Sequence, residues 1–195
     1  MAARLAGRTT AGAIALFVAV LSGCSEERPA SGSLPSSTAE TTSSEALPPL
    51  GPPDFPVPEA ARQNSAEGAL EFTRYYIALA AHVADGPQDP QPLLDLAQNC
   101  DQCQMIADSY GADRDAGYTY SDFTYTFEPA GPAIMRGPDA EVSFVFAQSE
   151  LLVFDSSGQP VTGRSAPATG ALASGARLVW NASEQSWNVS VLTIG

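Results

Sequence analysis

The pattern of apolar and polar residues divides the chain into three parts. A continuous apolar run extends from Ala11 to Leu21. From Ser25 to about Pro58 the residues are mostly Ser, Thr, Pro, Ala and Glu, and apolar side chains are isolated. From Glu59 to Gly195 apolar residues recur with regular periods, which predicts a folded region. A region of this length has the size of a single domain and can bury a core.

The first half of this region has the period of α-helices. Ser65 is a suitable N-cap, and Glu67 in the first turn favours the helix dipole. Apolar residues then recur at spacings of three and four, which predicts one amphipathic helix that ends at Asp85-Gly86-Pro87. The residues of this stripe are Ala69, Phe72, Tyr76, Leu79 and Val83.

Two further helices are predicted before the period changes. Asp89 can cap a short helix with Pro90 at its first position, which would bury Leu93, Leu94 and Ala97. A third helix is expected from about Asp101 to Tyr110, with Ile106 and Tyr110 facing inward and Gly111 ending it.

The second half of the region has the two-residue period of β-strands. Alternating apolar residues predict strands around Phe123–Phe127, Val142–Phe146 and Ala176–Trp180, and a short apolar strand at Leu151–Phe154. The turn from Asn181 to Gln185 would pair the last of these with Trp187, Val189 and Val191. Helices followed by an antiparallel meander indicate an α+β fold. We expect two to three N-terminal helices packed on a curved antiparallel sheet of four to six strands.

The N-terminal apolar run ends in Leu21-Ser22-Gly23-Cys24 and follows Arg4 and Arg8. This arrangement resembles the lipobox of bacterial lipoproteins, whose signal is cut off before the cysteine. Ala11–Leu21 has the length of a signal-peptide core and is too short to span a membrane. The resemblance implies a signal peptide over residues 1–23 and a lipid on Cys24, which would anchor the protein at the extracytoplasmic face of the bacterial cell membrane.

Residues 24–58 are predicted to be the lipidated cysteine and a disordered tether, because this composition buries too little apolar surface to fold. The folded domain is expected over residues 59–195.

The chain carries 22 Asp and Glu against 9 Lys and Arg, a formal net charge of -13. Such a surface repels phosphate backbones, so we expect no nucleic-acid partner.

Cys100 and Cys103 remain as a pair once Cys24 is lipidated. They are three residues apart at a predicted helix start, where their Cα atoms are close enough for a disulfide, and an extracytoplasmic location favours oxidation. A thioredoxin-like redox site would require a strand before the pair. A metal site would need more ligands than two cysteines and the distant His82, so we expect no metal and no cofactor.

Several segments of the folded region resemble an uncharacterised family of actinobacterial lipoproteins, a domain of unknown function. They are Glu59-Ala60-Ala61-Arg62-Gln63, Glu67-Gly68-Ala69, Phe72, Arg74-Tyr75-Tyr76 and Cys100-x-x-Cys103.

The layout of the folded region is also similar to the nuclear-transport-factor-2-like superfamily, which includes ketosteroid isomerase. The local match is Arg74-Tyr75, an apolar turn, a polar loop and a Leu-Leu-Asp-Leu helix. This second resemblance implies a cone-shaped fold with a pocket between helices and sheet.

The isomerase comparison implies that Tyr75 occupies the position of a tyrosine that donates a hydrogen bond to an oxyanion. The Glu-Asp-Pro-like motif that should carry the base is missing, and only Asp108 or Asp122 could substitute for it. We therefore expect a non-catalytic domain that binds a small apolar ligand or an envelope partner. The alternative is an isomerase or dehydratase type of enzyme that uses the same pocket around Tyr75 or Tyr76.

Overall fold

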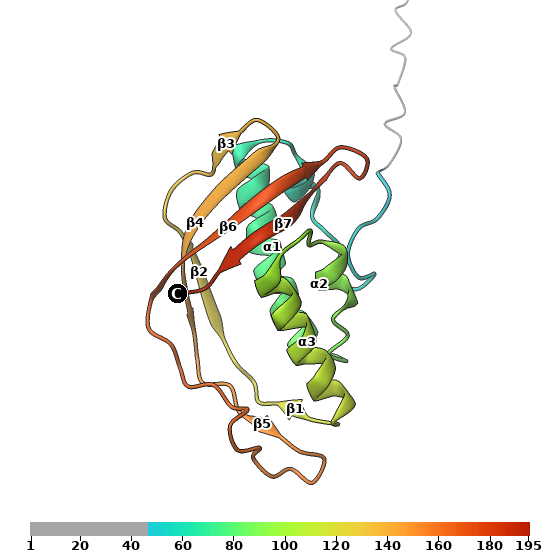
Figure 1. Cartoon of the computed structure of the whole chain (residues 1–195), viewed down its shortest axis with the longest axis vertical. Helices are drawn as coiled ribbons and strands as arrows, with labels where there is room; N and C mark the ends of the chain where they lie inside the picture. Colours follow the sequence, from blue (N-terminus) through green and yellow to red (C-terminus); the bar gives the residue numbers. More distant parts are fainter. Residues whose placement is uncertain (1–46) are drawn as a thin grey trace, which may run out of the picture. The chain divides into compact units, whose positions relative to one another are not determined.

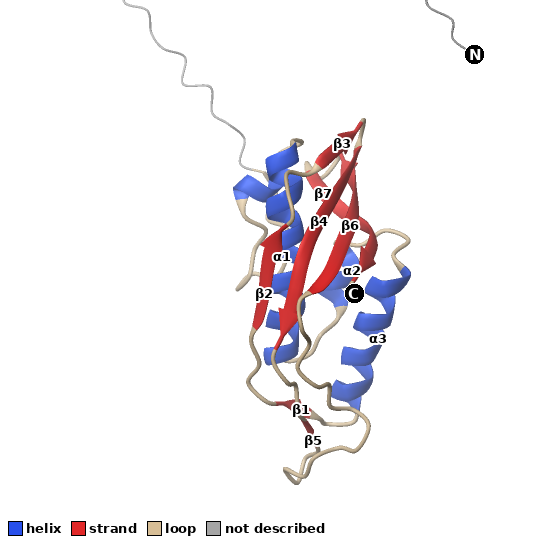
Figure 2. Cartoon of the chain, turned by 90° about the vertical axis from the view of Figure 1, so that its left-hand side faces the viewer, coloured by secondary structure: helices blue, strands red, loops and turns tan. Residues whose placement is uncertain are grey.

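The domain consists of helices packed on an antiparallel sheet, in a computed structural model that describes residues 47–195 (Figures 1 and 2). The predicted signal peptide, Cys24 and most of the predicted tether lie outside the described residues. The helical elements are a 3-10 helix η1 (Glu59–Arg62), α1 (Ala66–Asp85), α2 (Gln91–Asp95) and α3 (Asp101–Asp115). Within residues 47–195, no helix is both long and apolar enough to cross a membrane.

In the part of the chain that the structure describes, seven strands follow the helices, all paired antiparallel. The main sheet has the order β2-β4-β6-β7, with β3 also paired to β4, and β1 pairs with β5 in a separate two-stranded sheet. The strands are β1 (Thr119–Tyr120), β2 (Tyr125–Pro129), β3 (Ile134–Arg136), β4 (Asp139–Gln148), β5 (Val153–Phe154), β6 (Leu172–Asn181) and β7 (Ser186–Thr193). The predicted α+β fold, with three helices packed on an antiparallel sheet, is confirmed.

The first helix forms as the sequence predicts. The Ser65 side chain accepts a hydrogen bond from the Gly68 backbone N–H at 3.1 Å, which caps α1. All residues of the predicted apolar stripe are buried. They pack against the inward row of β4, where Val142 and Phe144 are also buried, so α1 and β4 form the centre of the core.

The third helix is one turn longer than predicted. Gly111 lies within α3 instead of ending it, and the helix continues to Asp115. The residue that ends it is Gly117, whose φ of +70° suits glycine. Its N–H bonds to the Arg114 carbonyl at 2.9 Å, and the Tyr118 N–H bonds to the Asp113 carbonyl at 2.9 Å. These two bonds are those of a Schellman motif, which requires the positive φ at Gly117 and not at Gly111.

The last strand changes phase along its length, which corrects one prediction. Trp187 and Val189 face inward as expected, but Val191 is exposed and Leu192 is buried in its place. The register shifts between Arg177 and Leu178, so β7 holds one extra residue there. A β-bulge reverses the side-chain alternation beyond it, and the residue period alone does not reveal it.

The structure also differs from the predicted boundary of the tether. Residues 50–57, which we name the strap, pack on α1 although the sequence predicted disorder up to residue 58. Val57 is buried, and the Phe55 ring stacks on His82 at 4.6 Å and on Tyr75 at 5.5 Å between ring centroids. Gly51 permits this approach, because a Cβ at its position would lie 2.3 Å from the Tyr75 hydroxyl. The folded domain therefore begins before Glu59.

Replacing the ring of the strap should measurably weaken the domain. We expect Phe55→Ala to lower the free energy of unfolding by about 1–2 kcal/mol, because it removes a partly buried aromatic ring and two ring contacts. Urea unfolding of residues 47–195 measures the change. Leu47→Ala is the control, since Leu47 is exposed and lies outside the strap. An unchanged midpoint for Phe55→Ala would show that the strap is not part of the folded unit.

Candidate functional site

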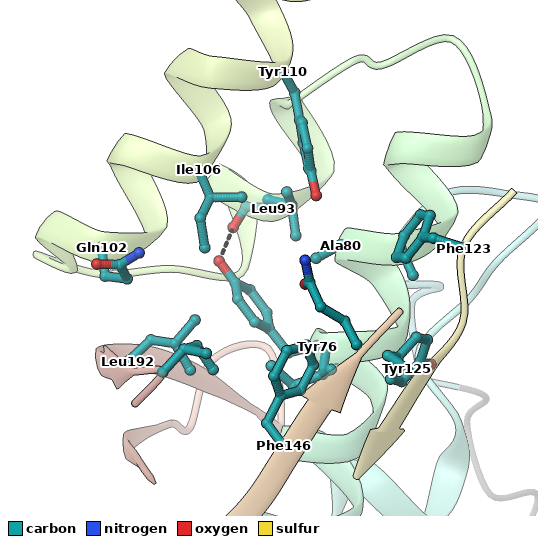
Figure 3. Close-up of a pocket in the computed structure, with 14 residues that line it drawn as sticks. Tyr76, Ala80, Leu93, Gln102, Ile106, Tyr110, Phe123, Tyr125, Phe146 and Leu192 are labelled. Atoms are coloured by element: carbon teal, nitrogen blue, oxygen red, sulfur yellow. Dashed lines mark hydrogen bonds between the residues drawn. The ribbon is translucent and has the colours of Figure 1, made fainter. Parts of the chain in front are cut away.

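A cavity of about 240 Å³ lies between α1, α3 and the adjoining ends of β2, β4 and β7 (Figure 3). Its volume is just below the usual range of small-molecule sites, roughly 300–1,000 Å³. The lining is mostly apolar and aromatic. The residues that line it are Tyr76, Ile77, Ala80, Ala81, Leu93, Gln102, Ile106, Tyr110, Phe123, Tyr125, Phe146, Gln148, Leu192 and Ile194.

The helices contribute residues at four-residue spacing, which places them on one face. Gln102, Ile106 and Tyr110 form one line along α3, and Tyr76 and Ala80 form a second line on α1. The start of α3 is held near the sheet by the preceding linker. There the Gln98 N–H bonds to the Val189 carbonyl at 2.8 Å, and the Val189 N–H bonds to the Leu96 carbonyl at 2.9 Å.

The strands supply an aromatic wall. Tyr125 of β2 lies opposite Gln148 of β4, and its ring stacks on Phe146 with centroids 6.3 Å apart. Both strands direct alternate residues to the core, so the side chains of Phe146 and Gln148 enter from the same row of β4. Phe123, from the loop before β2, extends this wall. The β2–β4 side of the site is therefore aromatic, whereas the helices contribute the rings of Tyr76 and Tyr110 together with aliphatic side chains.

Polar groups in the cavity are few and neutral. The Tyr76 hydroxyl donates to the Leu93 carbonyl at 3.2 Å (Figure 3), so its proton is already engaged. The side-chain amides of Gln102 and Gln148 and the hydroxyls of Tyr110 and Tyr125 have no hydrogen-bond partner among residues 47–195. Figure 3 shows the Tyr110 hydroxyl directed toward the space that the other labelled residues enclose. These groups are free to bind a ligand.

The tyrosines of the cavity are neutral at physiological pH. Burial raises the pKa of Tyr110 to about 12 and also raises the pKa of Tyr76 well above its usual value. The pKa of Tyr125 is raised as well, mainly by burial. No Asp, Glu, His, Lys or Arg lines the cavity. The described lining thus offers hydrogen-bond donors and acceptors, but no group that is poised to accept a proton from carbon.

Of the four residues that the sequence suggested for a pocket, the structure places only Tyr76 in this cavity. Tyr75 is the preceding residue on α1 and therefore faces another direction, toward the strap, where its hydroxyl donates to the Phe55 carbonyl at 2.8 Å. Asp108 is exposed on α3 and accepts a hydrogen bond from the Gln104 amide at 2.8 Å. It lies off the line of Ile106 and Tyr110, so it cannot reach the cavity.

Asp122 lies in a separate open groove. This groove is also lined by Phe55, His82 and Asp85, and it shares Phe123 and Tyr125 with the cavity wall. Asp122 is exposed there. The cavity that contains Tyr76 is therefore lined by neither Asp108 nor Asp122, the two carboxylates that the enzymatic alternative would need there.

Cys100 and Cys103 are joined by a disulfide at the start of α3, the pairing that their spacing favoured. Cys100 is the N-cap, and its sulfur accepts the Cys103 N–H at 3.2 Å. Cys103 is 1% exposed. The pair follows α2 and a turn at Asn99 with a φ of 54°, not the strand that a thioredoxin-like site would have. The bond fixes the turn that carries Gln102 into the cavity.

The far end of α3 is held by a buried charge. Asp113 is 4% exposed, pairs with the Arg164 guanidinium and accepts a hydrogen bond from the Tyr120 hydroxyl at 2.6 Å. Arg164 lies in the long connection between β5 and β6, and Tyr120 belongs to β1. The Tyr120 ring also contacts Tyr110, with centroids 6.1 Å apart. This cluster fixes the end of α3 from which Tyr110 enters the cavity.

The apolar pattern of the sequence had placed half of the residues that line the cavity on apolar faces. The helical and strand periods correctly placed Ile106, Tyr110, Tyr125 and Phe146 on inward faces. Periodicity does not show whether an inward residue meets another side chain or an open space. Gln148 carried a usable signal, because it is a polar residue in phase with Val142, Phe144 and Phe146.

No family model and no curated protein matches this chain. Solved structures do resemble the domain. The intermembrane-space region of the chloroplast protein ARC6 has a TM-score of 0.52 at 11% identity, and the match covers 68% of this chain and 97% of that one. At this identity the similarity shows a shared fold and nothing about function.

Weaker similarities include a nuclear transport factor 2 (NTF2-like) superfamily protein from Salmonella enterica serovar Typhimurium. Its TM-score is 0.41 at 13% identity, over 67% of this chain and 92% of that one. A protein from Catenulispora acidiphila has a TM-score of 0.40 at 11% identity, over 67% and 93% of the two chains.

Proposed function

We propose that the chain is a lipid-anchored protein of the bacterial cell envelope whose domain binds a small, largely apolar ligand without transforming it. The single observation that carries the binding function is the cavity between α1, α3 and the sheet, with its aromatic wall and its few uncommitted polar groups. A concave apolar site with a small number of hydrogen-bonding groups is the usual form of a ligand pocket.

The chemistry of the lining supports binding over catalysis. An isomerase or dehydratase needs a group that takes a proton, and the lining contains neither a carboxylate nor a histidine. Tyr76 already donates to the Leu93 carbonyl, and Tyr75 is directed to the strap. Among the described residues that line the cavity, the enzymatic alternative therefore has no carboxylate or imidazole base.

The anchor is supported by the Leu21-Ser22-Gly23-Cys24 motif after an apolar run of signal-peptide length. A diacylglycerol carries two acyl chains, which suffice for stable attachment. The acidic surface of the chain keeps the domain away from anionic headgroups, as suits a domain held by a tether.

Ligand binding can be tested with N-phenyl-1-naphthylamine, an uncharged probe that fluoresces in apolar surroundings. We expect saturable binding to residues 47–195, and at least about ten-fold weaker binding by Ala80→Phe, because the added ring overfills the cavity. Ala112→Phe is the matched control on an exposed face of α3. Equal titration curves for the two variants would contradict the cavity as the site, and would favour the reading of the domain as a module for an envelope protein.

Lipidation can be tested by metabolic labelling in a bacterial host. The full chain should incorporate radiolabelled palmitate and partition into Triton X-114, whereas Cys24→Ala should remain unlabelled and aqueous. The double variant Cys100→Ser with Cys103→Ser controls for cysteine loss elsewhere and should be labelled like the wild type. Labelling of Cys24→Ala at the wild-type level would rule out the anchor.

A further inference from the structure

The inward row of β4 ends in a polar residue whose side chain makes no hydrogen bond within residues 47–195. Ala140, Val142, Phe144 and Phe146 of this row are all apolar and buried. Gln148 is next in the same phase, lines the cavity, and its amide has no partner among residues 47–195. Gln148 is half-buried, and its amide is available to a molecule that enters the cavity.

The backbone at Gln148 is held on two sides. Its N–H donates to the Thr169 hydroxyl at 2.9 Å, and its carbonyl accepts the Thr169 N–H at 2.9 Å. On its other side it lies opposite Tyr125 in the β2–β4 pair. The direction of the side chain into the cavity is therefore fixed by the sheet, and a ligand would order only the amide itself.

The neighbours of the amide define what can lie beside it. The rings of Tyr125 and Phe146 lie next to Gln148 with their planes 18° apart, and Phe123 extends this aromatic wall. Flat rings favour offset stacking with another ring. A primary amide both donates and accepts hydrogen bonds, so it suits a hydroxyl, a carbonyl or another amide.

Charge restricts the ligand further. No cationic side chain lines the cavity, and the groove that shares Phe123 and Tyr125 with it carries Asp85 and Asp122 beside His82. An anion would lose its hydration without gaining a partner, which makes its burial costly. A neutral polar group bonded to the amide carries no such penalty.

From these observations, and resting on the proposed ligand-binding function, we infer that the domain selects uncharged, ring-shaped molecules that carry a hydrogen-bonding substituent, and that Gln148 is the residue that recognises this substituent. The ring stacks on the wall formed by Tyr125 and Phe146, and the substituent bonds to the Gln148 amide. Gln148 determines which rings are preferred and not whether rings bind, because the apolar wall alone would bind unsubstituted rings.

Three naphthalene probes of similar size test this inference: naphthalene, 2-naphthol and 2-naphthoate. A purely apolar site prefers naphthalene, because the hydroxyl of 2-naphthol is better hydrated in water. We expect wild-type residues 47–195 to bind 2-naphthol more tightly than naphthalene, and to bind 2-naphthoate most weakly of the three. Intrinsic tryptophan fluorescence or calorimetry measures the three dissociation constants.

The decisive variant is Gln148→Leu, which should reverse the preference in favour of naphthalene. The ratio of the two dissociation constants should change by about three- to ten-fold, the effect of one neutral hydrogen bond. Gln104→Leu is the matched control, because Gln104 is exposed on α3 and bonds to Asp108 outside the cavity. Gln148→Ala provides the same comparison should Gln148→Leu fail to fold.

An unchanged ratio in Gln148→Leu, with both probes still bound, would overturn the role of Gln148 and leave the proposed binding function intact. Tightest binding of 2-naphthoate would overturn the selection of uncharged molecules. Binding of none of the probes by the wild type would overturn the proposed function and this inference together.

Discussion

The packing of α1 on the inward face of β4 is the contact on which the rest of the domain depends. The stripe from Ala69 to Val83 buries its side chains against the row from Ala140 to Phe146, and these residues form one connected core. Burial of apolar area is the largest favourable contribution to folding. Because α1 is fixed on this row, the other elements are placed relative to it.

The cavity is a consequence of where this packing ends. Phe146 is the last large apolar residue of the β4 row, and two of the residues that α1 contributes to the lining, Ala80 and Ala81, are small. The small residues of α1 and the end of the apolar β4 row leave a volume between them that the side chains of α3 do not fill. The disulfide at Cys100–Cys103 and the Asp113–Arg164 pair hold the two ends of α3, so the space is kept open by fixed walls.

The sequence was informative where one period runs without interruption. The spacing of the α1 stripe, the cap at Ser65 and the alternation around Phe144 each follow from local chemistry, and the structure agrees with them. The sequence was uninformative where tertiary contacts determine where an element ends or whether a segment packs on the domain. Gly111 and Gly117 are both plausible helix ends, and only the bonds after α3 distinguish them. The strap has the composition of a tether, yet Phe55 finds a stacking partner in His82.

The candidate site was predictable only in part, for the same reason. The resemblance of the predicted element order to a known superfamily suggested a pocket between the helices and the sheet, and it placed Tyr75 in that pocket. In the structure, the position of Tyr75 on α1 directs its side chain to the strap instead. Which inward residues line a cavity depends on how far the elements lie apart, and this distance is not encoded in any single period. The sequence did contain one specific signal, the amide of Gln148 in an otherwise apolar row.

The most direct test of a ligand site between α1, α3 and the sheet is a methyl-resolved NMR titration of residues 47–195 with 2-naphthol. We expect saturable shifts of the methyl signals of Ile106, Leu192 and Ile194, which line the cavity. The methyl signals of Ile134 and Val191, which are exposed elsewhere, should stay in place. Shifts confined to Ile134 and Val191, with the cavity signals unmoved, would contradict the account.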